Sequence, residues 1–557
     1  MKRPRLCPSA WIVLLTCLLF PWPIPAASAN REFAQTLRLQ LEQMRVQGRT
    51  PLVHEPVRQQ DFLQDVYARE DFNPLWTRPG QVKQLLAAIA DSKQDGLRPE
   101  DYHQQTLVLL ERKMAQRNDA VTAAEYDILL TDALLSLGHD KLYGKTDPKI
   151  LETTWNLNNP RKETYVRPLM TALKEDRLQR MLPRLGPVQP FYTDLKAVLT
   201  TYHTLADRGG WPRVPDGPVL KPGVQGPRVE ALRRRLLVTG ELQRIGEQPQ
   251  LFDETLNNAV KSFQVRHYLE PDGIVAKTVL AALNVPVEER INQMRVNLER
   301  ARWVFHDVPN TFVIVDIAGF SLQYRYQGTL SWSTRVVVGQ PFNQTPIFRS
   351  EIRTMVLNPT WTVPAGIVNK EMVPSILKNP GYLKEQNLRI LDANEREIPA
   401  AAINFKQYVN KPFPYAIRQD AGVDGALGRI KFLFQNPYSV YLHDTPGKAL
   451  FGKTSRAFSH GCIRVQNPLE LGKLLLRNDP GNPVNAAAFD RMLAKGGTES
   501  ITLKTPVPVI LMYWTAQVRE GKVWFKPDLY KRDFKVLQAL NAVPENIPSR
   551  SRAGIAR

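Results

Sequence analysis

The stretch Phe458-Ser459-His460-Gly461-Cys462-Ile463-Arg464-Val465 contains Cys462, the only cysteine beyond the first 29 residues. The other two cysteines, Cys7 and Cys17, lie in a segment with the features of an export signal, so the mature chain is expected to carry one unpaired thiol. A free cysteine can also be a small buried hydrophobic residue. The adjacent histidine and glycine favour a reactive thiol.

The first 29 residues have the pattern of a signal peptide. Basic residues at positions 2, 3 and 5 precede the apolar run 11–20, and Ala27-Ser28-Ala29 fits a cleavage site. The apolar run is too short to span a bilayer. We expect export to a periplasm with no transmembrane span after cleavage, and an uncleaved anchor is the alternative.

The composition is that of a soluble multidomain protein. A chain of 557 residues is expected to form three or four domains at roughly 100–200 residues each. The hydrophobic fraction of 43% and the charged fraction of 23% exclude wholesale disorder. The net charge of +20 favours residence near anionic polymers or lipid head groups. Nothing in the sequence predicts a nucleic-acid partner.

Residues 30–215 have helical periodicity and are predicted to form a helical scaffold domain. Leu37, Leu41 and Met44 recur at helix spacing, and turn sequences interrupt the later apolar runs. The histidines of this region are isolated in the sequence and are expected to be structural or solvent-facing: His54, His103, His139 and His203.

Residues 216–285 are predicted to form a small three-helix bundle. The apolar pattern from Phe252 to Gln264, followed by Asp272-Gly273, resembles the three-helix peptidoglycan-binding domain. That resemblance implies sugar binding, and a structural or docking role is the alternative. Residues 286–310 are expected to be an amphipathic linker helix.

Residues 311–515 change to short β-branched and aromatic runs broken by Gly, Pro and Asn, which predicts a mainly β domain. An insertion at about residues 366–425 departs from this pattern, has helical character and is expected to act as a lid. Residues 516–557 are expected to be a C-terminal extension and tail. The fold class predicted is therefore a multidomain α+β protein.

A thiol needs activation to act as a nucleophile, since at its ordinary pKa near 8.5 it is only a few per cent thiolate at pH 7. His443 ends a predicted strand 19 positions before Cys462 and is expected to be the general base that ionises it. His460 is expected to shape the oxyanion pocket or contact substrate. The backbone amides of Gly461 and Cys462 are candidate oxyanion donors.

Two alternatives for this motif are weaker. Two histidines and a cysteine could bind zinc, but a second cysteine and paired ligand spacing are absent from the sequence, so no metal or other cofactor is predicted. A papain-like site would place the cysteine before the histidine. Here His443 comes first.

His443 followed by Ser459-His460-Gly461-Cys462-Ile463-Arg464 resembles the active-site signature of the L,D-transpeptidase catalytic domain, and Asn358-Pro359-Thr360-Trp361 resembles another part of it. The domain order resembles that of the large periplasmic L,D-transpeptidases of Gram-negative bacteria. The resemblance implies that Cys462 attacks the diaminopimelate carbonyl of a tetrapeptide stem, releases D-alanine, and passes the acyl group to a second diaminopimelate amine as a 3-3 cross-link. It also implies carbapenem susceptibility, peptidoglycan stem peptides as substrates, and cell-wall synthesis proteins as partners.

Four further side chains are candidates for substrate binding: Arg464, Ser459, Tyr441 and Trp361. Arg464 could neutralise a substrate carboxylate or brace the loop, and Tyr441 and Trp361 could be cleft walls or core residues. Two other functions stay open on the sequence. Water could replace the amine, which would make the protein an L,D-carboxypeptidase, or the chain could be a non-catalytic cell-wall scaffold.

Overall fold

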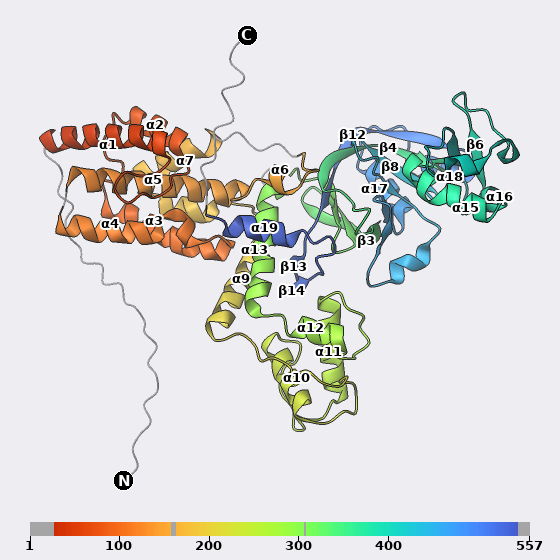
Figure 1. Ribbon diagram of the computed structural model, residues 1–557, viewed down its shortest axis with the longest axis horizontal. Helices are drawn as coiled ribbons and strands as arrows, with labels where there is room; N and C mark the ends of the chain where they lie inside the picture. Colours follow the sequence, from red (N-terminus) through yellow and green to blue (C-terminus); the bar gives the residue numbers. More distant parts are fainter. Residues whose placement is uncertain (1–26, 118, 157–162, 306–307, 544–557) are drawn as a thin grey trace.

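The computed structural model describes residues 27–117, 119–156, 163–305 and 308–543. A helical lobe, a smaller helical lobe and a β-rich lobe surround a group of central helices (Figure 1). The predicted signal peptide falls almost entirely outside the described residues. No helix within them is both long enough and apolar enough to cross a membrane.

The N-terminal lobe is built around α5 (Ala120–Tyr143), which is buried along most of its length. The helices that accompany it are α1 (Ala27–Gln47), α2 (Gln60–Arg69), α3 (Pro79–Asp91), α4 (Gln104–Gln116), α6 (Pro148–Leu151), α7 (Glu163–Lys174) and α8 (Leu178–Met181). The leucines and aromatic residues of these helices form one core with those of α5, except that Leu151 of α6 packs against the core of the β-rich lobe. The helical prediction for this region is confirmed.

Acidic side chains of α5 are buried inside this lobe and are neutralised there. Asp140 pairs with Arg58 at 2.8 Å, and Asp132 lies 2.8 Å from His103 Nε2. Glu55 contacts the other nitrogen of His103 at 3.1 Å. The prediction that His103 is structural is confirmed.

The centre of the molecule is a spine of α9 (Pro190–Asp207), α13 (Val287–Phe305) and α19 (Asp533–Asn541). Their apolar residues join the core of the β-rich lobe, as do those of the hairpin β13 (Ala516–Arg519) and β14 (Lys522–Phe525). Residues 516–541 were expected to be an extension, but they are part of this core. The expected linker helix α13 is almost wholly buried, so it is a structural centre.

The smaller helical lobe contains α10 (Pro227–Val238), α11 (Glu254–Arg266) and α12 (Lys277–Leu283) around a core of its own. Asp253 caps α11 by accepting a hydrogen bond from the Leu256 amide. The lobe docks on the β13–β14 hairpin, where Arg266 donates to the Val523 carbonyl at 2.6 Å and Lys522 donates to the Gly240 carbonyl at 2.9 Å.

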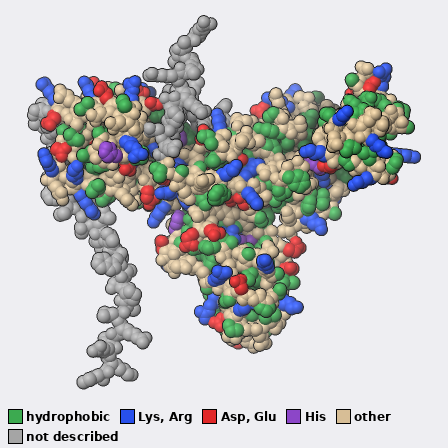
Figure 2. Space-filling view, in the orientation of Figure 1, with side chains coloured by type: hydrophobic (Ala, Val, Ile, Leu, Met, Phe, Trp, Pro, Cys, Tyr) green, Lys and Arg blue, Asp and Glu red, His purple; other side chains and the backbone are tan. Residues whose placement is uncertain are grey.

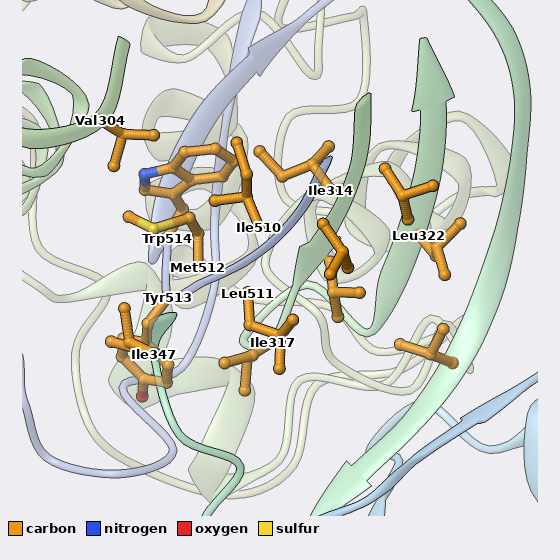
Figure 3. Packing of buried hydrophobic residues seen from close by; sticks show 14 of the residues in the cluster. Val304, Ile314, Ile317, Leu322, Ile347, Ile510, Leu511, Met512, Tyr513 and Trp514 are labelled. Carbon is orange, nitrogen blue, oxygen red and sulfur yellow. The ribbon is translucent and has the colours of Figure 1, made fainter. Parts of the chain in front are cut away.

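The β-rich lobe contains a sheet in the order β10-β3-β11-β9-β8-β4-β12-β1-β2, which closes on itself because β2 also pairs with β3. Its strands are β1 (Phe312–Asp316), β2 (Ser321–Tyr326), β3 (Thr329–Gly339), β4 (Phe348–Leu357), β8 (Ile430–Phe434), β9 (Leu442–His443), β10 (Ala457–Ser459), β11 (Ile463–Val465) and β12 (Glu499–Met512). Helices α17 (Pro468–Arg477) and α18 (Ala486–Lys495) follow β11. Strand β1 is buried on both faces, with Ile314 beside Ile510 on one face (Figure 3) and Val315 opposite Leu322 on the other.

An insertion at the outer end of this lobe has a separate core (Figure 1). We call residues 361–419 the lid. Its elements are β5 (Trp361–Thr362), α14 (Ala365–Ile367), a π-helical turn (Val368–Met372), α15 (Val373–Lys378), α16 (Tyr382–Glu385), β6 (Leu388–Leu391) and β7 (Ala416–Gln419). The expected helices are present, but β5, β7 and β6 also form a small sheet that the sequence pattern did not predict.

Charge is distributed over the surface. Lys and Arg side chains are spread over all the lobes on the face shown in Figure 2, with Asp and Glu among them. The net charge of +20 therefore does not gather into one basic patch on this face.

Candidate active site

The neighbouring strands β9 and β11 bring His443 and Cys462 onto one face of the sheet. The two strands are parallel, with Ile463 opposite Leu442 and Arg464 opposite His443. Leu442 and Ile463 point into the core, so the residues that alternate with them point away from it. This face therefore presents Tyr441, His443, Cys462 and Arg464 together.

The Cys462 thiol is held in a polar environment. It donates to the Ser439 carbonyl, with Sγ and O 3.6 Å apart. The backbone amide and the hydroxyl of Tyr441 both donate to the sulfur. Burial nevertheless raises the pKa of Cys462 above its ordinary value, although these donors and the charge of Arg464 act in the opposite direction.

The His443 imidazole is fixed in one tautomer. Its Nδ1 lies 2.5 Å from the Asp444 carbonyl oxygen, which can only accept, so Nδ1 carries the proton and Nε2 has a free lone pair. Burial first, and then the positive charge of Arg464, lower the pKa of His443 from 6.5 to about 3. The imidazole is therefore neutral at pH 7 and can accept a proton at Nε2.

The electrostatic prediction made from the sequence was wrong for this resting state. We expected an imidazole that ionises the sulfur and lowers its pKa below 8.5. The pKa of Cys462 is raised and that of His443 is lowered, so both groups are neutral before substrate binds. Such a pair can still act if the proton moves to the imidazole as the sulfur attacks.

The loop before Cys462 is organised by hydroxyl groups. Ser459 is buried, donates to the Cys462 carbonyl at 2.6 Å, and accepts from the Gly461 amide at 3.2 Å. Thr345 donates to the Gly461 carbonyl at 2.8 Å. Gly461 has φ +117°, a conformation that favours glycine. These contacts fix the backbone on the N-terminal side of the thiol.

These contacts correct two expectations. Ser459 was expected to bind substrate, but its hydroxyl is used inside the loop. The Gly461 amide was expected to be an oxyanion donor, but it donates to Ser459. Within the described part of the chain the Cys462 amide has no acceptor, so it remains the candidate oxyanion donor.

His460 connects the loop to the lid. Its Nε2 lies 2.6 Å from a carboxylate oxygen of Glu371, in the π-helical turn. π-helical turns occur frequently at functional sites. His460 thus contacts the lid, and it is not among the groups that hydrogen-bond to the Cys462 sulfur.

Hydrogen bonds link Trp361 and Tyr441 to the thiol. Trp361 hydrogen-bonds to the Tyr441 hydroxyl, which in turn donates to the Cys462 sulfur. The Tyr441 ring lies 5.5 Å from that of His443. Arg464 lies on the same face, and its Nε is buried with no hydrogen-bond partner among the described residues.

Sequence reasoning missed several residues of this site: Thr345, Glu371, Lys431, Ser439 and Asp444. Ser439 and Asp444 act through backbone carbonyls, which any residue type supplies. Lys431 lies opposite His443 on β8, a placement that only the strand register reveals.

Three family models match separate parts of the chain. Residues 310–508 match the L,D-transpeptidase catalytic domain, residues 225–283 match the family described as "Putative peptidoglycan binding domain", and residues 61–199 match a scaffold domain. The chain therefore contains an L,D-transpeptidase catalytic domain and a peptidoglycan-binding domain.

One curated relative is a Haemophilus influenzae protein named "Putative L,D-transpeptidase", which is 35% identical over 250 residues. The match covers 45% of this chain, and the chain spans about half the length of that relative, 50%. Similar solved structures include L,D-transpeptidase 3 from Mycobacterium tuberculosis with a faropenem-derived adduct, which is 12% identical. That match covers 37% of this chain and 60% of the other, with a TM-score of 0.19. An L,D-transpeptidase from Mycobacterium smegmatis is 10% identical, over 36% of this chain and 58% of the other, with a TM-score of 0.18.

Proposed function

We propose that the protein is a cysteine-dependent L,D-transpeptidase that forms 3-3 cross-links in peptidoglycan. The observation that carries the proposal is the shared sheet face of Cys462 and His443, with an imidazole whose Nε2 is free to accept a proton. The matched catalytic domain supports the same reaction class.

The first half-reaction forms a thioester. His443 Nε2 takes the Cys462 thiol proton as the sulfur bonds to the diaminopimelate carbonyl carbon of a tetrapeptide stem. The Cys462 amide stabilises the oxyanion. The carbon–nitrogen bond to the terminal D-alanine then breaks, and the imidazolium gives its proton to the departing amine.

The second half-reaction transfers the acyl group. The side-chain amine of diaminopimelate on a second stem attacks the thioester carbonyl, and His443 takes its proton. The carbon–sulfur bond breaks, and the proton returns to the sulfur. One imidazole thus serves as base and acid in both halves. Its lowered pKa keeps it in the neutral form that each half-reaction starts from.

The substrates place the enzyme outside the cytoplasm, at the peptidoglycan layer. The peptidoglycan-binding domain docks on the hairpin that joins the central core, so wall binding would hold the catalytic domain near stem peptides. An exported, periplasmic enzyme fits this arrangement. Cell-wall synthesis proteins would be its partners there.

The test is mass spectrometry of the products from a purified disaccharide tetrapeptide. We expect dimers linked through two diaminopimelate residues together with released D-alanine, and no product with Cys462→Ala. Tripeptide without dimer would show a carboxypeptidase instead. No product from the wild type would leave only a scaffold function, and unchanged cross-linking by Cys462→Ala would contradict the cysteine mechanism.

A further inference from the structure

Two cations flank the His443 imidazole on the thiol face of the sheet. Lys431 on β8 lies directly opposite His443 on one side, and Arg464 on β11 lies directly opposite it on the other. Residues opposite one another in neighbouring strands point to the same face. Lys431, His443 and Arg464 therefore form a row across three strands, one step from Cys462.

Neither cation has an anionic partner. Among the described residues no hydrogen bond or ion pair involves the side chain of Lys431 or Arg464, although both are half-buried. Burial lowers the pKa of each. Deeply buried cations elsewhere are paired, with Arg58 on Asp140 and Lys526 on Asp316.

The carboxylates near Lys431, His443 and Arg464 already have other hydrogen-bond or ion-pair partners. Asp444 accepts from the Arg429 amide at 2.9 Å and pairs with Lys448. Glu371 pairs with His460 on the lid side. The row therefore keeps two positive charges that no carboxylate of the described chain neutralises.

Half-buried charge without a partner is unfavourable, and a bound anion would remove that cost. We propose that Lys431 and Arg464 form a subsite for a carboxylate of the donor peptide, next to the carbonyl that Cys462 attacks. This inference rests on the proposed function for the identity of the donor. Lys431 is then a specificity residue rather than a structural one.

The spacing limits which carboxylate can bind. Cys462 and Arg464 are two residues apart on one strand, or about 7 Å along it. One peptide residue spans at most about 3.6 Å, so the carboxylate lies within about two residues of the attacked carbonyl. Two groups of a tetrapeptide donor fit: the terminal carboxylate of D-alanine and the second carboxylate of diaminopimelate.

The direct test uses two alkylating probes of nearly equal size, anionic iodoacetate and neutral iodoacetamide, on the full chain. Modification of Cys462 is followed by peptide mapping, which separates it from Cys7 and Cys17. The iodoacetate-to-iodoacetamide rate ratio cancels any change in thiol ionisation. We expect Lys431→Met to lower this ratio about three- to tenfold, which is the effect of losing the attraction between one nearby positive charge and the iodoacetate anion.

A matched control is Lys495→Met, which removes an exposed lysine of α18 that pairs with Glu499. It should leave the ratio unchanged. In the wild type, raising the ionic strength should also lower the ratio towards that of free cysteine, a measurement that needs no variant. A ratio equal to that of free cysteine at low salt, or unchanged in Lys431→Met, overturns the inference.

Tetrapeptide donors amidated either at the D-alanine carboxylate or at the second diaminopimelate carboxylate then identify which of the two binds. Amidation of the bound carboxylate should raise KM about tenfold in the wild type and have little effect in Lys431→Met. Turnover that is insensitive to both amidations overturns the subsite while the proposed function stands. Iodoacetate selectivity without turnover of any donor supports the anion subsite and rejects the proposed function.

Discussion

At the scale of single residues, the site depends on a thiol and an imidazole that are both neutral until substrate arrives. His443 is kept neutral by burial and by the nearby positive charge of Arg464, and its orientation is set by the Asp444 carbonyl. Cys462 is kept protonated by burial. A site of this kind favours proton transfer during attack over a standing thiolate.

This account predicts the pH dependence of Cys462 alkylation by iodoacetamide. Because the pKa of Cys462 is raised, the thiolate fraction and the rate should rise with an inflection above that of free cysteine in the same buffer. Arg464→Met should move the inflection higher still, since Arg464 acts to lower that pKa. An inflection well below free cysteine would restore the thiolate–imidazolium pair that the sequence suggested.

The sequence was sufficient to predict that His443 and Cys462 lie on neighbouring strands, which the pairing of β9 with β11 confirms. Their catalytic partnership stays a prediction. The sequence was not sufficient for Ser459, whose hydroxyl faces the loop backbone, or for Lys431, whose position depends on strand register. Side-chain orientation and register arise from tertiary packing. A pattern of residue types does not contain them.

At the scale of elements, an exposed hydrogen bond between His460 and Glu371 joins the active-site loop to the lid. Exposed pairs contribute about 0.2–1 kcal/mol. Glu371→Ala should therefore raise KM for the donor about two- to fivefold and increase hydrogen exchange in residues 363–378, with little change in kcat. Steady-state kinetics and exchange mass spectrometry measure both.

The control for this prediction is Glu395→Ala, which removes another exposed lid pair, with Arg418 at 2.7 Å, away from the loop. It should leave KM unchanged. Equal effects of the two substitutions, or a large loss of kcat in Glu371→Ala alone, would contradict a positioning role for the His460–Glu371 contact.

The spine helix α13 supplies a prediction about stability. Asn297 is fully buried, donates to Thr515 Oγ1 at 2.8 Å and accepts from the Thr515 amide at 2.8 Å. Asn297→Leu would leave the buried Thr515 amide without an acceptor and should cost about 1–3 kcal/mol. Thermal unfolding measures the loss, and Glu288→Leu at an exposed position of α13 should change stability by less than about 0.5 kcal/mol.

Element types were predictable from periodicity, but their burial was not. The apolar face of α13 was visible as Ile291, Met294 and Leu298, which suggested a linker helix. Its polar face is buried too, because Arg300 pairs with Asp533 and Arg302 pairs with Glu299. The Asp533 partner is remote in sequence, so no local pattern reveals it. The short strands of the lid were not predicted for a similar reason, since each contains too few residues to show a two-residue alternation.

At the scale of the whole molecule, the helical lobe holds its shape through buried ion pairs. Burial acts to lower the pKa of His103, but hydrogen bonds to Asp132 and Glu55 outweigh it and raise that pKa from 6.5 to about 9. A group whose pKa is higher in the folded state stabilises the fold fully below its unfolded pKa. That stabilisation is lost as the pH rises through the folded value.

His103→Gln should therefore destabilise the helical lobe by about 3 kcal/mol more at pH 6 than at pH 10. Urea unfolding of wild type and variant at several pH values measures this difference, and the comparison cancels other groups that titrate. A difference in stability that stays constant over this pH range would contradict the charged, paired His103.

The most direct test of the central claim is the rate of acyl-enzyme formation, followed by intact-protein mass spectrometry with a tetrapeptide donor in a single turnover. Wild type should gain the mass of the donor minus D-alanine, localised to Cys462. Cys462→Ala should gain none, His443→Ala should acylate about 10²–10⁴-fold more slowly, and His460→Ala should lose much less. Acylation of Cys462→Ala, or unchanged acylation in His443→Ala, would contradict a reaction driven by Cys462 and the neutral His443 imidazole.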